Sequence, residues 1–126
     1  MEIDRPEILA EVAGLFAAYE TALVTNDVAV LDGLFWQHAK VVRYGATEIL
    51  HGYAEIAAFR ASRPSAGLAR TLERTVITTF GQDFATASTT FTRNGRTGRQ
   101  QQSWVRLPEG WRIVAAHVSF LERFGA

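Results

Sequence analysis

Two stretches of the chain carry different patterns of apolar residues. Between Pro6 and Leu23 apolar side chains recur at steps of three and four, which places them on one face of a helix. Thr25-Asn26-Asp27 ends this pattern and offers a cap for a second helix that runs to Trp36. A third helix is expected after Gly52, and it should stop before Arg63-Pro64 because proline disfavours a helical conformation in the residue before it.

The rest of the chain is dominated by strand-forming residues. Thr, Val, Ile and Phe are dense between Thr71 and Thr92, and such residues suit a pleated sheet. The predicted long strands are 71–80, 84–92, 100–107 and 111–120, separated by turns at 81–83, 94–98 and 108–110; the predicted short strands are 41–45 and 47–50. This order predicts an α+β domain of three helices followed by a mainly antiparallel sheet.

The last hairpin allows a prediction of register. A three-residue loop with Gly110 in the left-handed conformation would pair Leu107 with Trp111, and therefore Gln101 with His117. One face would then be apolar near the loop and polar at the far end: Gln101, Ser103, Val105, Leu107, Trp111, Ile113, Ala115, His117 and Ser119. Such a face indicates a sheet that packs on helices at one end and lines a cavity at the other.

Composition restricts the class of protein. The chain has 126 residues and a mass of 13.9 kDa, which predicts a single domain over residues 1–126. Thirteen basic residues balance thirteen acidic ones, which argues against a nucleic-acid or membrane-surface binder. Only Lys40 among the basic residues is a lysine. Because the planar guanidinium of arginine suits carboxylate partners, this bias favours ion pairs or binding of small anions.

Several kinds of chemistry lack the residues they need. The chain has no cysteine, and its three histidines, His38, His51 and His117, fall on different elements without ligand spacing, so no metal and no cofactor is expected. The acidic start does not have the features of a signal peptide, and no apolar run approaches the ~20 residues needed to cross a bilayer. These features predict a cytoplasmic protein.

Several short blocks of the sequence can be compared with known families: Tyr19–Asp27, Leu34-Phe35-Trp36, Val42–Gly45, Ile56–Arg60, Thr78–Gly81, Gly98-Arg99-Gln100, Trp104-Val105-Arg106 and Gly110–Ser119. In this order they resemble the family of AtzH and the oxalurate-catabolism protein HpxZ, within the nuclear-transport-factor-2-like (NTF2-like, SnoaL-like) superfamily. The resemblance covers about residues 8–120.

The resemblance implies a cone-shaped fold with three N-terminal helices packed on a curved sheet, and a homodimer formed through the sheet. It further implies a role in bacterial nitrogen catabolism beside an amidase of the amidase-signature type. In the cyanuric-acid branch a member is assigned as a decarboxylating amidohydrolase of carboxylated ureas, such as 1,3-dicarboxyurea to allophanate. A Tyr and an Arg needed for that activity match Tyr19 and Arg43 here.

Each candidate residue also has a simpler interpretation. Arg43 either forms a surface ion pair or holds a substrate carboxylate through two charge-assisted hydrogen bonds. Tyr19 lies on the apolar face of the first helix, so it is either a core residue or a proton donor facing the cavity.

The expected pocket lining follows from the polar end of the predicted hairpin face. Gln101, Ser103, His117 and Ser119 would line the pocket, or would be ordinary hydrogen-bonded residues of the sheet, and Trp36 would be a pocket wall or part of the core. His117 and Ser119 have no orienting acid in the same hairpin, which argues against a nucleophile and base pair. The remaining arginines singled out, Arg60, Arg63, Arg70 and Arg74, are expected to include solvated or interface charges, and none of them is given a site role.

Three functions remain open at this point. The first is a cofactor-independent enzyme that removes a carboxyl group from a small carboxylated urea or ureido acid. The second is a non-catalytic protein that binds an unstable carboxylate for a companion amidase. The third is a scaffold of the kinase-association-domain type, which shares the cone and would form large rings.

Overall fold

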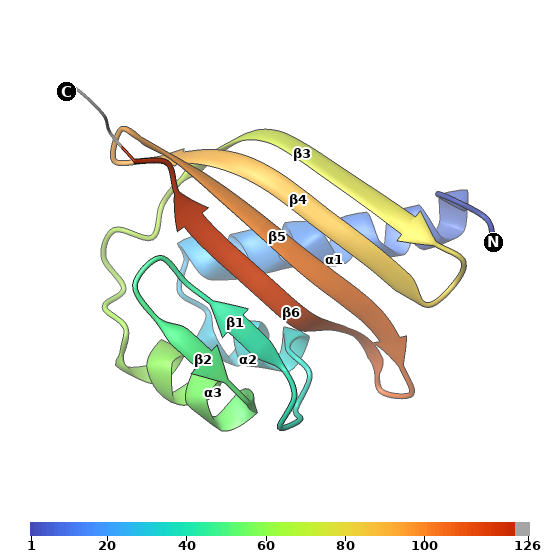
Figure 1. Cartoon of the computed structure of the whole chain (residues 1–126), viewed down its shortest axis with the longest axis horizontal. Helices are drawn as coiled ribbons and strands as arrows, with labels where there is room; N and C mark the ends of the chain where they lie inside the picture. The colour runs from blue at the N-terminus through green and yellow to red at the C-terminus, as the bar shows by residue number, and fades with distance from the viewer. Residues whose placement is uncertain (123–126) are drawn as a thin grey trace.

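The computed structural model describes residues 1–122 and contains three helices and six strands (Figure 1). In chain order these are α1 (Pro6–Val24), α2 (Val28–Leu34), β1 (Val42–Tyr44), β2 (Ile49–His51), α3 (Tyr53–Ser62), β3 (Thr71–Phe80), β4 (Phe84–Arg93), β5 (Arg96–Leu107) and β6 (Gly110–Phe120). The predicted order of helices and strands is confirmed. No helix within residues 1–122 has the length and hydropathy of a membrane span.

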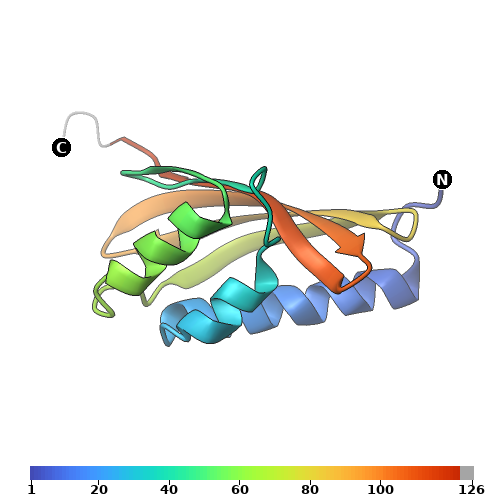
Figure 2. The same ribbon diagram turned by 90° about the horizontal axis from the view of Figure 1, so that it is seen from below.

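The six strands form one sheet in the order β2-β1-β6-β5-β4-β3. Only β1 and β6 are parallel; every other neighbouring pair is antiparallel. All three helices lie against the same side of this sheet, which we call the helix face (Figure 2). The opposite side, the outer face, carries no helix of residues 1–122 (Figures 1 and 2).

The turn between β4 and β5 is tighter than the sequence pattern predicts. Asn94 and Gly95 alone connect the strands, with φ values of 51° and 74°, as a two-residue hairpin turn of mirror-image type requires. Arg93 therefore pairs directly with Arg96, and β5 begins four residues before the predicted start at Gln100. The predicted five-residue turn over 94–98 is wrong.

The predicted register of the last hairpin is wrong near the loop. Pro108 and Glu109 form a two-residue connection that pairs Leu107 with Gly110, one residue away from the expected partner Trp111. The predicted pairs further along the hairpin, Ser103 with Ala115 and Gln101 with His117, are nevertheless present.

A β-bulge between Ser103 and Trp104 reconciles the two registers. Trp104 pairs with Ile113 and Ser103 pairs with Ala115, so Val114 of β6 is the extra residue. Because successive side chains of a strand alternate between faces, this one insertion reverses the alternation along the rest of β6. The single apolar-to-polar face predicted for this hairpin is therefore wrong.

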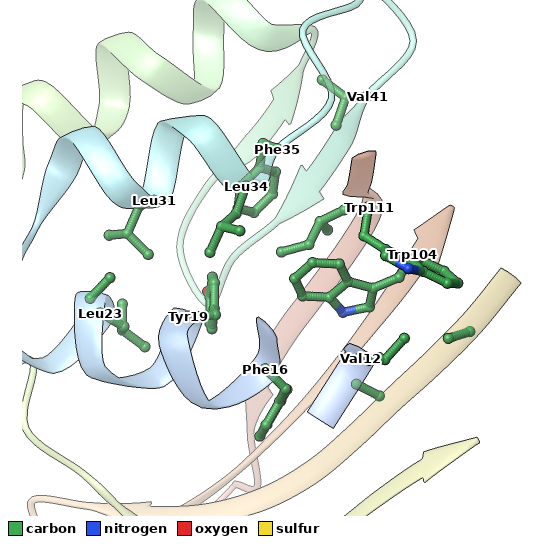
Figure 3. Close-up of a cluster of buried hydrophobic side chains, with 14 of the residues drawn as sticks. Val12, Phe16, Tyr19, Leu23, Leu31, Leu34, Phe35, Val41, Trp104 and Trp111 are labelled. Atoms are coloured by element: carbon green, nitrogen blue, oxygen red, sulfur yellow. The ribbon is translucent and has the colours of Figure 1, made fainter. Parts of the chain in front are cut away.

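The hydrophobic core fills the part of the helix face beneath α1 and α2. Trp104 is fully buried there, with Val12 of α1, Leu31 of α2 and Phe35, which follows α2 (Figure 3). Ile113 of β6 is also fully buried in this core. Asp27 caps α2 by accepting a hydrogen bond of 3.3 Å from the Val30 amide.

A glycine at the far end of β5 makes room for an aromatic ring. Gly98 pairs with Phe91 of β4, and a Cβ atom at position 98 would overlap the Phe91 ring. Phe91 is fully buried and packs edge-on against Phe120 with ring centroids 5.5 Å apart. Only a glycine at position 98 permits this stacking.

Replacing Gly98 by alanine should therefore lower the free energy of unfolding by about 1–3 kcal/mol, the usual cost of overpacking a core. Chemical denaturation monitored by fluorescence would measure the change. Gly14→Ala, in an exposed helical position with no atom within 4 Å of the added carbon, should instead stabilise by about 0.4–1 kcal/mol. Equal stability of Gly98→Ala and the unmodified protein would contradict this account.

A candidate anion-binding site on the helix face

Tyr19 lies on α1 where the core meets a polar region. Its side chain is 3% exposed, and its ring centroid lies 6.4 Å from that of Phe35. In Figure 3 the ring extends from α1 toward Leu34 and Phe35. No hydrogen bond joins the Tyr19 hydroxyl to another residue in the described range 1–122. The ring is thus a core residue, as one interpretation expected, while its hydroxyl remains free to act on a ligand.

Arg43 is the central residue of β1 and points to the helix face. It pairs with Ala116 of β6, and its residue exposure is only 9%. Its Nη1 donates a hydrogen bond of 2.7 Å to Glu48, and the guanidinium lies 5.5 Å from the Phe59 ring centroid. Arg43 therefore forms an ion pair, but a largely buried one, and within residues 1–122 its Nε and Nη2 have no acceptor.

Glu48 is held in the turn between β1 and β2. It accepts hydrogen bonds from Arg43 and from the backbone and hydroxyl groups of Thr47. Burial by itself would raise the pKa of Glu48, but the hydrogen bonds from Thr47 and Arg43, with the Arg43 charge, outweigh it and lower that pKa below its usual value. Glu48 is thus ionised at neutral pH and orients the Arg43 guanidinium.

Two more arginines are buried in ion pairs on this face. Arg70 binds Glu20 through two hydrogen bonds of 2.7 and 3.0 Å, and it also donates to Gln100 at 3.1 Å. Arg60 binds Asp32 at 2.6 Å. Their side chains are 1% and 3% exposed, so the solvated charges expected among the four arginines do not include Arg60 or Arg70.

Arg63 and Arg93 complete the cluster without a carboxylate partner. Arg63 follows α3 directly, and Arg93 ends β4. Burial lowers the pKa of the Arg63 guanidinium, and the positive charges of Arg43 and Arg60 lower it further. Burial and the charge of Arg70 lower the pKa of Arg93 in the same way. Arginine nevertheless stays protonated in proteins, so both remain cations.

These side chains gather at one end of the molecule. The β1–β2 turn, the connection from α3 to β3 and the β4–β5 turn lie at the same end of the sheet, beside the C-terminal half of α1 (Figure 1). The pKa values of Arg63 and of Arg93 both respond to Tyr19 and to Arg43, so these two residues lie within electrostatic range of both arginines. The arrangement is a group of arginines at one end of the helix face, with Tyr19 within electrostatic range of Arg63 and Arg93.

The other predicted site residues lie on the outer face. Gln101 and His117 form a cross-strand pair there, with His117 next to Tyr44 of β1 at a ring separation of 5.9 Å. Ser119 accepts a hydrogen bond of 2.9 Å from Arg99, and Ser103 alternates with buried Gln102. A hollow of about 450 Å³ on this face is lined by Arg74, Val76, Ser88, Thr89, Thr90, Arg99, Gln100, Gln101, His117 and Ser119. The structure does not bring this group together with Tyr19 and Arg43.

Trp36 and Arg74 occupy peripheral positions. Trp36 follows α2, packs partly buried against the core, and stacks on His38 with ring centroids 4.0 Å apart. Its backbone N–H donates to Ile113 at 3.0 Å, which fixes the chain between α2 and β1. Arg74 is exposed on β3, as expected for a solvated charge. Within residues 1–122 no group of three acidic or histidine side chains could hold a metal ion.

Sequence reasoning gave Arg63 no site role and did not identify Arg93 or the three acidic partners Glu20, Asp32 and Glu48. Arg63 and Arg93 stand at the ends of their elements, where side-chain direction cannot be inferred from periodicity. The one available signal is the almost complete use of arginine in place of lysine, which indicates buried or anion-binding cations but does not say which ones.

The fold and the sequence place the chain among known proteins. A solved structure of an NTF2-like superfamily protein from Salmonella enterica superposes with a TM-score of 0.74 at 25% identity, covering 95% of both chains. The chain thus has the NTF2-like fold, and it belongs to the AtzH-like family, whose family model matches residues 1–123.

Two other crystal structures are more similar to this chain. One is a protein of unknown function from Pectobacterium atrosepticum SCRI1043, with 60% identity over 95% of both chains and a TM-score of 0.93. The other is a cystatin-like fold protein from Burkholderia xenovorans LB400, with 48% identity over 98% of both chains and a TM-score of 0.92. None of the functionally curated proteins matches the chain.

The lowered pKa of Glu48 predicts a pH dependence of stability. A carboxyl group whose folded pKa lies below its unfolded value stabilises the protein at higher pH, and this contribution is lost as the pH falls from about 4 through the folded pKa. In Glu48→Gln, unfolding free energy should therefore decline less steeply between about pH 5 and pH 3. Glu109→Gln, an exposed carboxylate at the β5–β6 loop, is the matched control. Parallel pH profiles for Glu48→Gln and the unmodified protein would contradict the assignment.

Proposed function

We propose that this protein is a cofactor-independent decarboxylating amidohydrolase that removes a carboxyl group from a carboxylated urea or ureido acid. The single observation that carries the proposal is the free hydroxyl of buried Tyr19 within the positive cluster that includes Arg43. Membership of the AtzH-like family supports the same class of reaction. A companion amidase would consume the product.

Arg43 has the features needed to orient a carboxylate. Glu48 occupies Nη1, so the edge formed by Nε and Nη2 can donate two parallel hydrogen bonds to the two oxygens of one carboxylate. A largely buried position strengthens this interaction, since little water competes for the guanidinium. The carboxylate would then be held in a fixed plane relative to the nitrogen that carries it.

Tyr19 would supply the proton that the reaction needs. When an N-carboxylate leaves as CO₂, the N–C bond breaks and its electron pair stays on nitrogen, which must gain a proton because an amide-like anion is a poor leaving group. The Tyr19 hydroxyl would donate that proton to nitrogen, and the resulting tyrosinate would recover a proton from water. The overall change is one proton consumed and one CO₂ released.

Two variants should separate binding from chemistry. Tyr19→Phe should keep the fold and much of the ligand affinity but lower kcat about 10²- to 10⁴-fold, the usual contribution of a positioned donor. Arg43→Lys should lose about ten- to a hundredfold in affinity, on the order of 1.5–3 kcal/mol, because an ammonium cannot reproduce a planar two-point contact. Release of CO₂ and ammonia from biuret-, allophanate- and oxalurate-related acids, with and without a companion amidase, is the measurement.

The outcomes of this assay also separate the enzyme from a binding protein. Binding without CO₂ release by the purified protein would contradict the enzyme and leave an accessory protein that holds an unstable carboxylate. Normal turnover by Tyr19→Phe would reduce Tyr19 to a core residue. Turnover by the Tyr19→Phe, Arg43→Lys double variant should be little lower than that of the less active single variant. The proton donor and the arginine that holds the carboxylate act on the same transition state, so their losses do not add.

We also propose that two copies pair through their outer faces. Val76, Tyr44 and Phe84 are 49%, 37% and 38% exposed on this face, and Val76 lines its hollow. Exposed apolar side chains that share one face are typical of interfaces between copies of a chain. Pairing would cover the sheet and leave the helix face of each copy open to ligand.

Light scattering should give a mass of twice 13.9 kDa for the unmodified protein. Val76→Glu should give the monomer mass, because an unpaired charge would be buried in the contact. Val30→Glu, at an exposed position of α2 on the other side of the molecule, should leave the dimer intact. A monomer before any substitution, or a large ring, would overturn this pairing.

A further inference from the structure

The hollow on the outer face carries positive charges that the proposed reaction does not use. Arg74 of β3 and Arg99 of β5 line it, together with His117 of β6. No carboxylate of residues 1–122 lines the hollow or lies within 4.0 Å of either arginine. Glu73, next to Arg74 in the chain, instead accepts a hydrogen bond from Thr92. The hollow is therefore a cationic depression without a counter-charge from the described part of the chain.

The strand register brings the two arginines close together. Arg74 pairs with Thr90 of β4, and Thr90 pairs in turn with Arg99. Ser119 of β6 lies on the far side of Arg99 in the same cross-strand row. Neighbouring strands are about 4.8 Å apart, which separates the Cα atoms of the two arginines by about 10 Å. Two arginine side chains that flank a threonine at this spacing can both reach one anion bound between them.

The polar groups of the hollow have hydrogens left to donate. Arg99 Nε donates to Ser119 Oγ at 2.9 Å, and Gln101 Nε2 donates to Ser88 Oγ at 3.1 Å. Each serine oxygen thus already accepts a hydrogen bond, and the hydrogen of each hydroxyl is uncommitted. Within residues 1–122, neither the Arg74 guanidinium nor the Nη atoms of Arg99 donate to a protein acceptor. A ligand that only accepts hydrogen bonds fits such a set of donors.

Pairing of two copies through their outer faces would concentrate this charge. A two-fold interface buries the same patch of both copies, so Arg74 and Arg99 of each copy would enter one contact. Burying guanidinium groups that lack a counter-charge is costly. An anion held in each hollow would offset that cost, and the second copy would shield the anion from water.

We propose that the outer-face hollow is a ligand site that binds a tetrahedral dianionic oxyanion group, phosphate or sulfate, between Arg74 and Arg99. The two guanidinium groups match its two charges and donate charge-assisted hydrogen bonds to its oxygens. The hydroxyls of Ser88 and Ser119 and the ring N–H of His117 add neutral donors from other strands. Donors that converge from several strands suit a tetrahedral group better than a planar one. The volume of about 450 Å³ is ample for it.

This site is separate from the Tyr19 and Arg43 side chains on the helix face, and it does not depend on the proposed reaction. Its link to pairing does rest on the dimer proposed above. Because the ligand would be enclosed by both copies, its binding and the association of the copies would strengthen each other.

Calorimetry with inorganic phosphate tests the site directly. At constant ionic strength, with chloride as the balancing anion, phosphate should bind the unmodified protein. Arg74→Gln and Arg99→Gln should each lower the phosphate affinity about ten- to a hundredfold, the usual loss when a charged hydrogen-bond donor is removed. Lys40→Gln removes the same charge from an exposed position outside the hollow and should leave the affinity unchanged. Circular dichroism would check that these surface variants fold.

The source of the oxyanion group can be determined in the same way. Phenyl phosphate carries the group on a larger body. Competition by phenyl phosphate with inorganic phosphate in the unmodified protein would indicate a phosphate monoester as ligand. Binding of inorganic phosphate without such competition would indicate the free ion, enclosed between two copies.

Light scattering over a dilution series tests the link to pairing. Phosphate should lower the protein concentration at which the dimer dissociates, and chloride at equal ionic strength should not. In the Arg74→Gln, Arg99→Gln double variant, phosphate should lose this effect. The dimer of that variant should persist in chloride alone, because the charges that oppose pairing are gone.

The outcomes separate the site from the reaction and from the dimer. Absence of phosphate binding, or equal affinity in Arg74→Gln, Arg99→Gln and the unmodified protein, would overturn the site even if the protein releases CO₂ from an acid. An equal loss in Lys40→Gln would overturn it too, since the effect would then be one of net charge. Loss confined to the two arginine variants would support the site even if no acid tested is turned over.

Discussion

One extra residue in β6 determines which side chains of the central strands face the helices. At the loop end of the β5–β6 hairpin, Trp104 and Ile113 point to the helix face and close the core against Phe35. Beyond the bulge at Val114, the alternation of β6 reverses relative to an unbroken strand, so that Ala116 rather than Ala115 lies across from buried Gln102. A small alanine at that position faces the same side as its parallel neighbour Arg43 in β1. The bulge therefore sets both the packing of the core and the room beside the guanidinium.

The core and the charged cluster share this helix face and meet at Tyr19. Its ring belongs to the apolar side, and its hydroxyl belongs to the polar side. Such a boundary gives a titratable or hydrogen-bonding group a rigid support while one edge stays open to a ligand. It also explains why buried arginines are tolerated here: aromatic rings under Arg60 and Arg70 offset part of the lost hydration, and each of the two has a carboxylate partner.

Sequence patterns predicted the helices and strands of the fold correctly, but they did not predict which strand residues lie on which face of the sheet. Helical periodicity defined α1 almost to the residue, and turn residues separated the strands. The bulge left no signal, because Pro108-Glu109-Gly110 suits a two- or a three-residue loop equally well. The wrong alternation then assigned Gln101 and His117 to the same face as Trp111. Family resemblance identified Tyr19 and Arg43 as candidate site residues. The positions of Arg63 and Arg93 depend on where α3 and β4 end in the folded structure, which the sequence pattern does not give.

The residues of the charged cluster come from several elements spread between Tyr19 and Arg93. Tyr19 is on the first helix, Arg63 follows the third, and Arg93 ends β4 at the turn into β5. No single helix or hairpin contains the cluster, so it requires the folded arrangement of these elements. Local opening of a single hairpin would still disrupt the cluster, and amide hydrogen exchange reports such an opening. A bound ligand would consequently slow exchange in every element that supplies the cluster, because each opening that disrupts the cluster must first release the ligand.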